Sequence, residues 1–308
     1  MLHHACPNTK FGIAPICREI FLNRRVSYLF VISVHYQITR LNHAKFGVGA
    51  WYSVDSMATD AKKAICVILA YNCARTLENT FRRIPLETVD RIVLIDDAST
   101  DGTLEVARRL GIESYTHEHL GYGGNVKYSI RKGIELGADY IIDLHGDGQY
   151  DPGAIPLALA KAREGYDFVL GSRFVDRSQP LRDGMSWARY LANIGLSTIE
   201  RVVLDLPLSE FHTGFRIYTK HLAETVALDA TSDAHLFSFE IIAQARFCNL
   251  RIGEVPIRCG YKEEHTSISL PKAALYSLQT FKTLALFLLA RAGFKIALFS
   301  CKKAQNAS

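Results

Sequence analysis

A short apolar run that ends in a dense group of acids and glycines most constrains what this chain can fold into. Residues 140–142 read Tyr-Ile-Ile, which is typical of a buried strand. Residues 143–152 then read Asp-Leu-His-Gly-Asp-Gly-Gln-Tyr-Asp-Pro, and the proline is placed to open a helix. Such oxygen-rich strand ends can hold a hard cation, because Mg²⁺ binds through one or two carboxylates, waters and substrate phosphates. A solvated turn between a strand and a helix would explain the same acids.

Two further apolar runs end in polar clusters. Residues 91–95 precede the acidic segment 96–103, and residues 64–70 precede Tyr71 and Asn72. A helical segment follows each run, which indicates an α/β fold with a mostly parallel central sheet and helices on both faces. Ligands of such open sheets bind outside the carboxyl ends of the strands, so we expect the three clusters on one rim.

The remaining elements continue this alternation. We expect helices over residues 103–110, 121–136, 186–204 and 234–247, and strands over residues 112–116, 139–144, 168–170 and 251–257. The segment 211–216 reads as a turn that leads into another short strand. A glycine cluster at residues 121–124 opens one helix, where free backbone N–H groups could contact a phosphate. Close packing of the backbone against a neighbour explains the same glycines.

Taken together, these clusters resemble the motifs of the family-2 glycosyltransferases, which have the GT-A fold. Six segments match in chain order, namely residues 71–72, 96–103, 147–152, 171–174, 214–216 and 254–257. The resemblance covers roughly residues 64–270 and is nearest to the dolichol-phosphate mannose synthase-like and polyprenyl-phosphate branch. It implies a metal-dependent, inverting enzyme that moves a sugar from a nucleoside-diphosphate sugar to a polyprenyl or dolichyl phosphate. A saccharide or other hydroxyl acceptor, or a catalytically weak sugar-nucleotide-binding protein, are the alternatives.

The resemblance also implies roles around the nucleotide. Tyr71, Asn72, Asp96 and Asp97 would surround the base and the ribose. Carboxylates suit both groups, because they accept hydrogen bonds from ring N–H groups and from ribose hydroxyls. Asp101 is expected instead to cap the helix that begins near residue 103.

The predicted metal site departs from the family at one position. Asp147 is the first expected ligand of Mg²⁺ or Mn²⁺, and Gln149 is the second. His145 stands where the family usually has an acid. A neutral imidazole suits Mn²⁺ better than Mg²⁺, so His145 either ligates the metal or contacts a phosphate or a water.

The acceptor decides which further groups are needed. A lipid phosphate requires cations, and Arg173 and Arg216 are the candidates because guanidinium groups bind phosphate bidentately. A hydroxyl acceptor requires a general base, for which Glu210 is the candidate. Otherwise Glu210 pairs with an arginine. Residues 262–267 read Lys-Glu-Glu-His-Thr-Ser where the family often has basic residues and a Ser-Lys pair, so the acceptor loop has diverged.

Composition excludes several other classes of protein. The 308 residues carry a formal net charge of +5, which suits anionic nucleotide sugars and lipids but is not that of a dedicated nucleic-acid binder. No Gly-x-Gly-x-x-Gly follows the first strand, which disfavours a nicotinamide dehydrogenase. The seven cysteines are scattered, with no Cys-x-x-Cys pair, and indicate a reducing compartment without a disulfide framework.

The two ends differ from the middle of the chain. We expect residues 1–60 to be a poorly ordered extension or a mis-assigned start, with Met57 just before the first strand. A short membrane-contacting hairpin around residues 26–34 is the rival interpretation. The glycosyltransferase domain is expected to span residues 61–270, in the cytoplasm or peripherally on the cytosolic membrane face.

The remaining residues 271–308 are predicted to form a C-terminal amphipathic helical segment. Its apolar part, residues 275–299, would place Arg291, Lys295 and Lys302 near one helical face. This helix would either dock on the core or lie in a membrane interface. A spanning helix is disfavoured, because Arg291 interrupts the apolar run.

Overall fold

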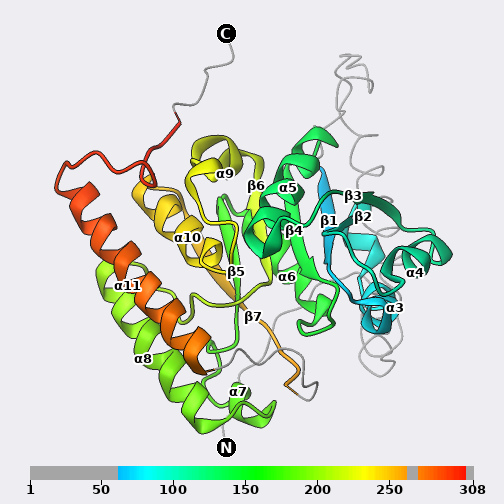
Figure 1. The fold of residues 1–308 in the computed structure, drawn as a ribbon, viewed down its shortest axis with the longest axis horizontal. Coiled ribbons are helices and arrows are strands. Elements are labelled where there is room, and N and C mark those ends of the chain that lie inside the picture. The colour runs from blue at the N-terminus through cyan, green and yellow to red at the C-terminus, as the bar shows by residue number, and fades with distance from the viewer. Residues whose placement is uncertain (1–61, 262–269, 303–308) are drawn as a thin grey trace, which may run out of the picture. The chain divides into compact units, whose positions relative to one another are not determined.

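A seven-stranded sheet in the order β3-β2-β1-β4-β6-β5-β7 forms the centre of the fold (Figure 1). The computed structural model describes residues 62–261 and 270–302. The extension predicted for residues 1–60 and the divergent loop at residues 262–267 therefore lie outside the described residues. The strands are β1 (Ala64–Ala70), β2 (Arg91–Asp96), β3 (Glu113–Thr116), β4 (Tyr140–His145), β5 (Phe168–Ser172), β6 (Arg216–Thr219) and β7 (Ile252–Pro256).

Strand pairing confirms the prediction of a mostly parallel sheet. β1 pairs in parallel with β2 and β4, β2 with β3, and β5 with β7. β6 is inserted antiparallel between β4 and β5. The chain first builds β2 and β3 on one side of β1 and then crosses to β4 on the other side. This reversal of strand order makes the carboxyl ends of β1 and β4 a topological switch point, where open α/β sheets bind their ligands.

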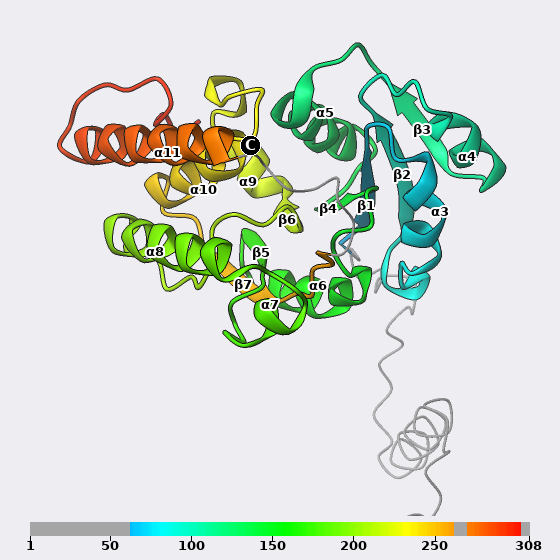
Figure 2. The same ribbon diagram turned by 60° about the horizontal axis from the view of Figure 1, so that its bottom comes forward.

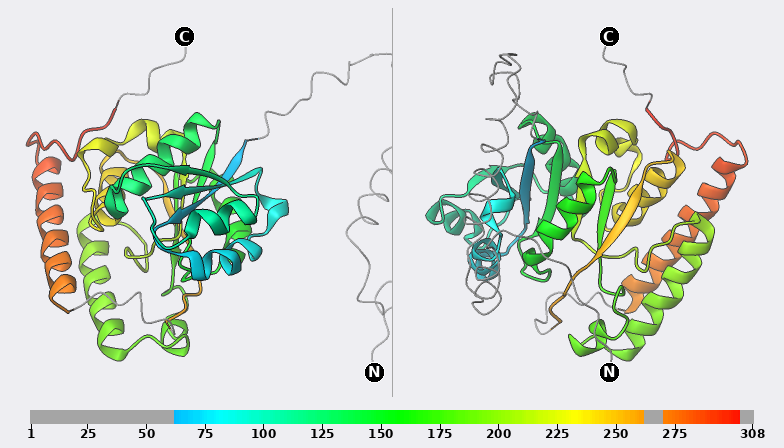
Figure 3. Two further views of the ribbon diagram at one scale, coloured as in Figure 1. Left: turned by 45° about the vertical axis from the view of Figure 1, so that its right-hand side comes forward. Right: turned by 180° about the vertical axis from the view of Figure 1, so that it is seen from behind.

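Helices cover both faces of the sheet, as the alternating pattern predicts (Figures 2 and 3). One face packs against α3 (Ala74–Arg82), α4 (Thr103–Arg109) and α6 (Ile155–Arg163). The other face packs against α5 (Gly121–Glu135), α8 (Trp187–Leu204), α9 (Lys220–Thr225), α10 (Phe237–Phe247) and α11 (Leu270–Arg291). The shorter elements are α7 (Gln179–Arg182), η2 (Leu86–Thr88), η3 (Pro152–Ala154) and η4 (Leu228–Ala230).

The central strand β1 shows why the apolar runs became strands. All of its residues are buried, since helices cover both faces of a parallel sheet. Successive side chains of a strand point to opposite faces. Ile65 and Val67 accordingly join the core under α5 and α10, whereas Cys66 and Ile68 join the core under α3 and α6.

The C-terminal helix is present, but it ends earlier than the sequence suggests. α11 stops at Arg291, and Gly293 follows with φ +98°. Glycine adopts this left-handed conformation readily and so commonly terminates helices. Lys295 and Lys302 therefore lie beyond the helix, and the prediction that they share a helical face with Arg291 is wrong. Within the described part of the chain, Lys272–Arg291 is a stretch long and apolar enough to cross a membrane.

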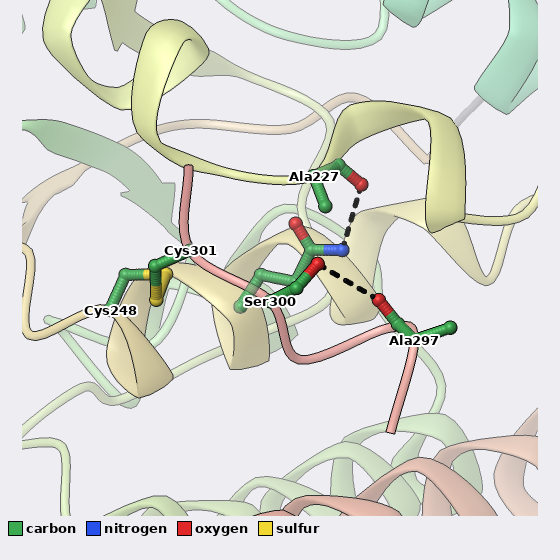
Figure 4. Close-up of a disulfide and its surroundings, with 6 residues drawn as sticks. Ala227, Cys248, Ala297, Ser300 and Cys301 are labelled. Carbon is green, nitrogen blue, oxygen red and sulfur yellow. Dashed lines mark hydrogen bonds between the residues drawn. A yellow bond between two sulfur atoms is a disulfide. The ribbon is translucent and has the colours of Figure 1, made fainter. Parts of the chain in front are cut away.

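A disulfide fastens the chain after α11 to the body of the fold (Figure 4). It joins Cys248, at the end of α10, to Cys301, which is 53 residues further along the chain. The N–H of Lys302 donates to the carbonyl of Thr225 at 2.7 Å, so the tail is also held by a backbone hydrogen bond. The cysteine spacing predicts no disulfide framework, whereas the fold brings Cys248 and Cys301 together, because spacing along the sequence does not report distance in the fold.

Candidate active site at the switch point of the sheet

The three polar clusters lie together at the carboxyl ends of β1, β2 and β4. These strands are neighbours in the sheet, and their last residues are in register. Ala70 pairs with Asp96, and Leu69 pairs with His145. The prediction that the clusters share one rim is confirmed, and they lie at the point where the strand order reverses.

Asn72 turns the chain out of β1 and ties it to the loop after β2. Its φ of 50° is left-handed, a conformation that asparagine tolerates better than most residues. The Asn72 Oδ1 atom accepts the N–H of Thr100 at 2.8 Å, and the Asn72 N–H donates to Ser99 Oγ at 2.8 Å. The neighbouring Tyr71 remains 53% exposed, with its ring centroid 4.8 Å from that of His119. Tyr71 is therefore an open aromatic surface at the rim.

Asp96 is fully buried and only partly satisfied. Its Oδ2 atom accepts the N–H of Ser99 at 3.1 Å and the hydroxyl of Thr116 at 3.2 Å. Its Oδ1 atom is buried and has no partner among the described residues. A buried carboxylate oxygen without a donor is costly, so this atom favours a donor supplied from outside the chain.

Asp97, in contrast, is committed to the start of α5. Its two oxygens accept the N–H groups of Leu120 and Gly121 at 2.6 and 3.1 Å. His119 Nδ1 lies 3.0 Å from the carboxylate as well. An acid at this place satisfies free donors and complements the positive end of the helix dipole. Asp97 therefore has a structural role at the start of α5, and its contact with the ribose stays a prediction.

The glycines at the start of α5 are explained by close packing. The N–H groups of Gly123 and Gly124 donate to the carbonyl of Asp233 at 2.7 and 3.2 Å. A Cβ at Gly123 would lie 2.8 Å from the carbonyl oxygen of Ala234 and 2.8 Å from the Cβ of Phe237. Because Asp97 and Asp233 already use these donors, the geometry supports the packing interpretation over direct phosphate contact.

Asp101 also has the structural role that the sequence predicts. Its Oδ1 atom accepts the N–H of Thr103 at 3.1 Å at the start of α4. Its Oδ2 atom accepts the N–H of Ala74 at 3.0 Å at the start of α3. One carboxylate thus joins two helix N-termini, and these hydrogen bonds help to lower its pKa against the opposing effect of desolvation.

Asp147 lies in the turn that follows β4. It is partly exposed, and its Oδ1 atom accepts the N–H of Gln149 at 2.9 Å. Gly148 between them has φ +74°, which makes this tight turn possible. Across residues 62–261 and 270–302, no group of three His, Cys, Asp or Glu side chains is arranged to hold a metal. A divalent cation here would fit if water and substrate phosphates completed the shell, as Mg²⁺ commonly requires.

His145 is the last residue of β4 and directly precedes this turn. Its ring is edge-on to the rings of Tyr122 and Tyr150, with centroids 5.6 and 5.4 Å away. It packs so tightly over Gly214 that any side chain there would overlap the imidazole. The His145 Nε2 atom lies 4.0 Å from Asp143 Oδ1, and neither atom has a hydrogen-bond partner within the described residues.

Asp143 is a site residue that the motif comparison did not single out. Burial raises its pKa to about 6, although His145, Arg216 and a hydrogen bond from Tyr218 lower it. An acid inside an otherwise apolar strand was the available signal, because a buried carboxylate needs a partner. That partner is Tyr218 of β6, whose hydroxyl donates to Asp143 Oδ2 at 3.2 Å.

The two predicted phosphate-binding arginines are buried and already bonded. Arg216 is fully buried, and its guanidinium donates to the carbonyls of Thr213 and Ser238 at 3.1 and 2.7 Å. Arg173 is 5% exposed and donates through its backbone N–H, Nε and Nη2 to Glu210. Its Nη1 donates to the hydroxyl of Tyr261 at 3.2 Å. The interpretation of Glu210 as an ion-pair partner therefore agrees with the structure.

The chain belongs to the family described as glycosyl transferase family 2, whose model matches residues 65–227. Solved structures of glucosyl-3-phosphoglycerate synthase from Mycobacterium tuberculosis share the fold. The complex with Mn²⁺, UDP-glucose and phosphoglyceric acid superposes with a TM-score of 0.54 at 17% identity, covering 77% of this chain and 81% of that one. The expected GT-A fold and the expected enzyme family are confirmed.

Curated relatives of similar size act on lipid phosphates. The UDP-N-acetylglucosamine–dolichyl-phosphate N-acetylglucosaminyltransferase of Methanococcus voltae is 26% identical over 223 residues, which cover 66% of this chain and 88% of that protein. The undecaprenyl-phosphate mannosyltransferase of Micrococcus luteus is 29% identical over 208 residues, covering 63% and 82%. These names support the placement in the polyprenyl-phosphate branch of the family.

Proposed function

We propose that this glycosyltransferase uses a nucleoside-diphosphate sugar and a divalent cation to glycosylate a polyprenyl phosphate. The donor would lie at the carboxyl ends of β1 and β4. Tyr71 offers an exposed ring on which a planar base can stack. The unpartnered Oδ1 atom of Asp96 offers an acceptor for a base N–H or a ribose hydroxyl.

Asp147 would hold the metal beside the diphosphate, with Gln149 as a second oxygen ligand. Bound Mg²⁺ or Mn²⁺ stabilises the charge that develops on the leaving nucleoside diphosphate. We assign His145 to the wall of the site, since its Nε2 atom lies toward Asp143. Under this assignment the imidazole borders the site and is not a required ligand of the metal.

The buried ion pair of Glu210 with Arg173 is the observation that favours one class of acceptor over the other. A hydroxyl acceptor needs a base, and Glu210 is held by three donors of Arg173 in a fully buried position. Because this carboxylate is fully buried and engaged by Arg173, it is not placed to contact the hydroxyl of an acceptor. A lipid phosphate is already an anionic nucleophile and needs no base, which agrees with the names of the relatives. We therefore assign Arg173, Glu210 and Arg216 to positioning the loop around residues 209–216.

The test is transfer of labelled sugar from a panel of UDP- and GDP-sugars to undecaprenyl phosphate or to a soluble saccharide. We expect transfer to the lipid phosphate, lost on chelation and restored by Mn²⁺. Asp147→Asn should lower the rate at least ~10²-fold, because a metal ligand contributes several kcal/mol to the transition state. Asp151→Asn is the matched control, since Asp151 lies four residues on and pairs with the exposed Arg83.

Two results would overturn the proposal. Transfer only to the saccharide would establish the hydroxyl-acceptor alternative. An Asp147→Asn variant as active as Asp151→Asn, in metal-free and metal-replete buffer alike, would show that the turn after β4 holds no catalytic cation.

A further inference from the structure

Two long helices on one face of the sheet turn apolar side chains toward solvent. α8 and α11 contact each other and lie side by side in Figure 1. Trp187, Leu191 and Val202 of α8 are 66%, 63% and 74% exposed. Leu278 and Leu288 of α11 are 66% and 52% exposed. We call this surface the α8–α11 face, and large exposed apolar side chains on two neighbouring helices are a mark of an interaction site.

The opposite side of α11 belongs to the protein core. Thr280, Leu284 and Phe287 are each at most 3% exposed, and the latter two join the large core cluster with α10. The helix therefore cannot leave the body of the protein without breaking this packing. Its outward stripe is suited to lying along a surface rather than to crossing a bilayer alone.

The exposed charges within α8 and α11 have one sign. Within α8 the only acid is Glu200, which is fully buried, and α11 contains no Asp or Glu. Lys272, Lys282 and Arg291 of α11 are exposed, and Lys295 follows just beyond its end. Asp205, which ends α8, is exposed but pairs with Arg246. Apolar helices whose own exposed charges are cations are complementary to a bilayer that carries anionic headgroups.

We propose that the α8–α11 face docks flat on an anionic lipid bilayer. The proposal deepens the proposed function and rests on it in one respect, since a lipid acceptor requires the enzyme to work at a membrane. A second copy of the chain is disfavoured, because two-fold contact would bring the same cations against each other. Residues 1–61 are disfavoured as the occupant, because they hold six Lys or Arg and three Asp or Glu.

Trp187 provides a direct reporter of docking. The chain has two tryptophans, so Trp51→Phe leaves Trp187 as the single emitter. Adding vesicles of phosphatidylglycerol and phosphatidylcholine should shift its emission to shorter wavelength, and brominated lipids should quench it. Binding without a shift or quenching at Trp187 would show that another surface makes the contact.

Paired variants test whether membrane binding is specific to the α8–α11 face or arises from any exposed apolar side chain. Val202→Ser/Leu278→Ser should weaken sedimentation with anionic vesicles by about tenfold or more, because both side chains would lose burial in the bilayer. Leu86→Ser/Leu157→Ser is the control, since these residues are 60% and 51% exposed and belong to elements on the other side of the sheet. Equal loss in both pairs would overturn the assignment.

Charge-reversal variants and transfer assays complete the test. Lys282→Glu/Arg291→Glu should reduce binding to anionic vesicles more than tenfold and leave the weak binding to neutral vesicles unchanged, since each cation near the leaflet strengthens binding by roughly fivefold. A concentration-dependent dimer in ultracentrifugation that Val202→Ser/Leu278→Ser abolishes would instead identify a second copy as the occupant. Binding is measured on vesicles without polyprenyl phosphate, and transfer is measured separately on vesicles that contain it. Docking on the first kind without transfer on the second would refute the proposed function alone, whereas transfer without docking would refute this inference alone.

Discussion

The Arg173–Glu210 ion pair allows the sharpest test of what these two residues do. Arg173 is 5% exposed and Glu210 is fully buried, so neither charge is compensated by water. The carboxylate accepts the backbone N–H and the Nε of Arg173, both at 2.8 Å, and also its Nη2. Burial opposes the charge of Arg173, but the pairing with Glu210 raises its pKa well above the usual value. Because a guanidinium is not deprotonated in proteins, removing Glu210 would leave its charge buried and unpaired.

Removing one partner should therefore destabilise the fold strongly. Loss of one member of a buried ion pair costs about 3–5 kcal/mol, because the other charge stays buried and unpaired. We expect Glu210→Gln near the low end, since the amide keeps the shape and one acceptor oxygen. Arg173→Met should be near the high end. In a domain of this size, 1 kcal/mol corresponds to a shift of about 2–4 °C in Tm.

The double variant decides between a structural and a catalytic reading. In Arg173→Met/Glu210→Gln no charge is left unpaired, and the amide oxygen at position 210 can still accept the backbone N–H of residue 173. Its destabilisation should be smaller than the sum of the single changes by about 3 kcal/mol, which is a large coupling energy. Urea unfolding followed by circular dichroism gives each free energy from the midpoint and the m-value. Single variants that unfold within about 1 kcal/mol of the wild type and are additive, but lack transfer activity, would refute this reasoning and return both residues to the chemistry.

Two further predictions concern packing and the disulfide. Gly123→Ala should destabilise the fold by about 2–3 kcal/mol, because its Cβ would press on the segment that follows Ser232. Gly195→Ala in α8 has nothing within 4 Å and should instead stabilise by about 0.5–1 kcal/mol, so equal melting shifts would contradict the packing argument. Cys301→Ser should lower the free energy of unfolding by up to about 4 kcal/mol, because the bond to Cys248 closes a loop with a sequence separation of 53. Mass spectrometry of the unreduced protein checks that the bond forms, and an equal stability of oxidised wild type and variant would speak against it.

The strands and most helices could be predicted from the sequence alone. Runs such as residues 64–70 and 140–142 are apolar on every position, and this pattern is typical of strands that are covered on both faces. Turn residues then fix where each run ends. The polar clusters could also be placed on one rim, because parallel strands point their carboxyl ends the same way.

Tertiary structure decided what each polar residue in those clusters does. Asp96 and Asp97 are adjacent in the sequence, yet one keeps a buried oxygen without a partner and the other caps α5. Arg173 and Glu210 are 37 residues apart, and no local pattern reveals that they form a buried pair. The same holds for Cys248 and Cys301. Periodicity reports which side of an element is covered, whereas these partners come from other elements, so only the assembled fold determines them.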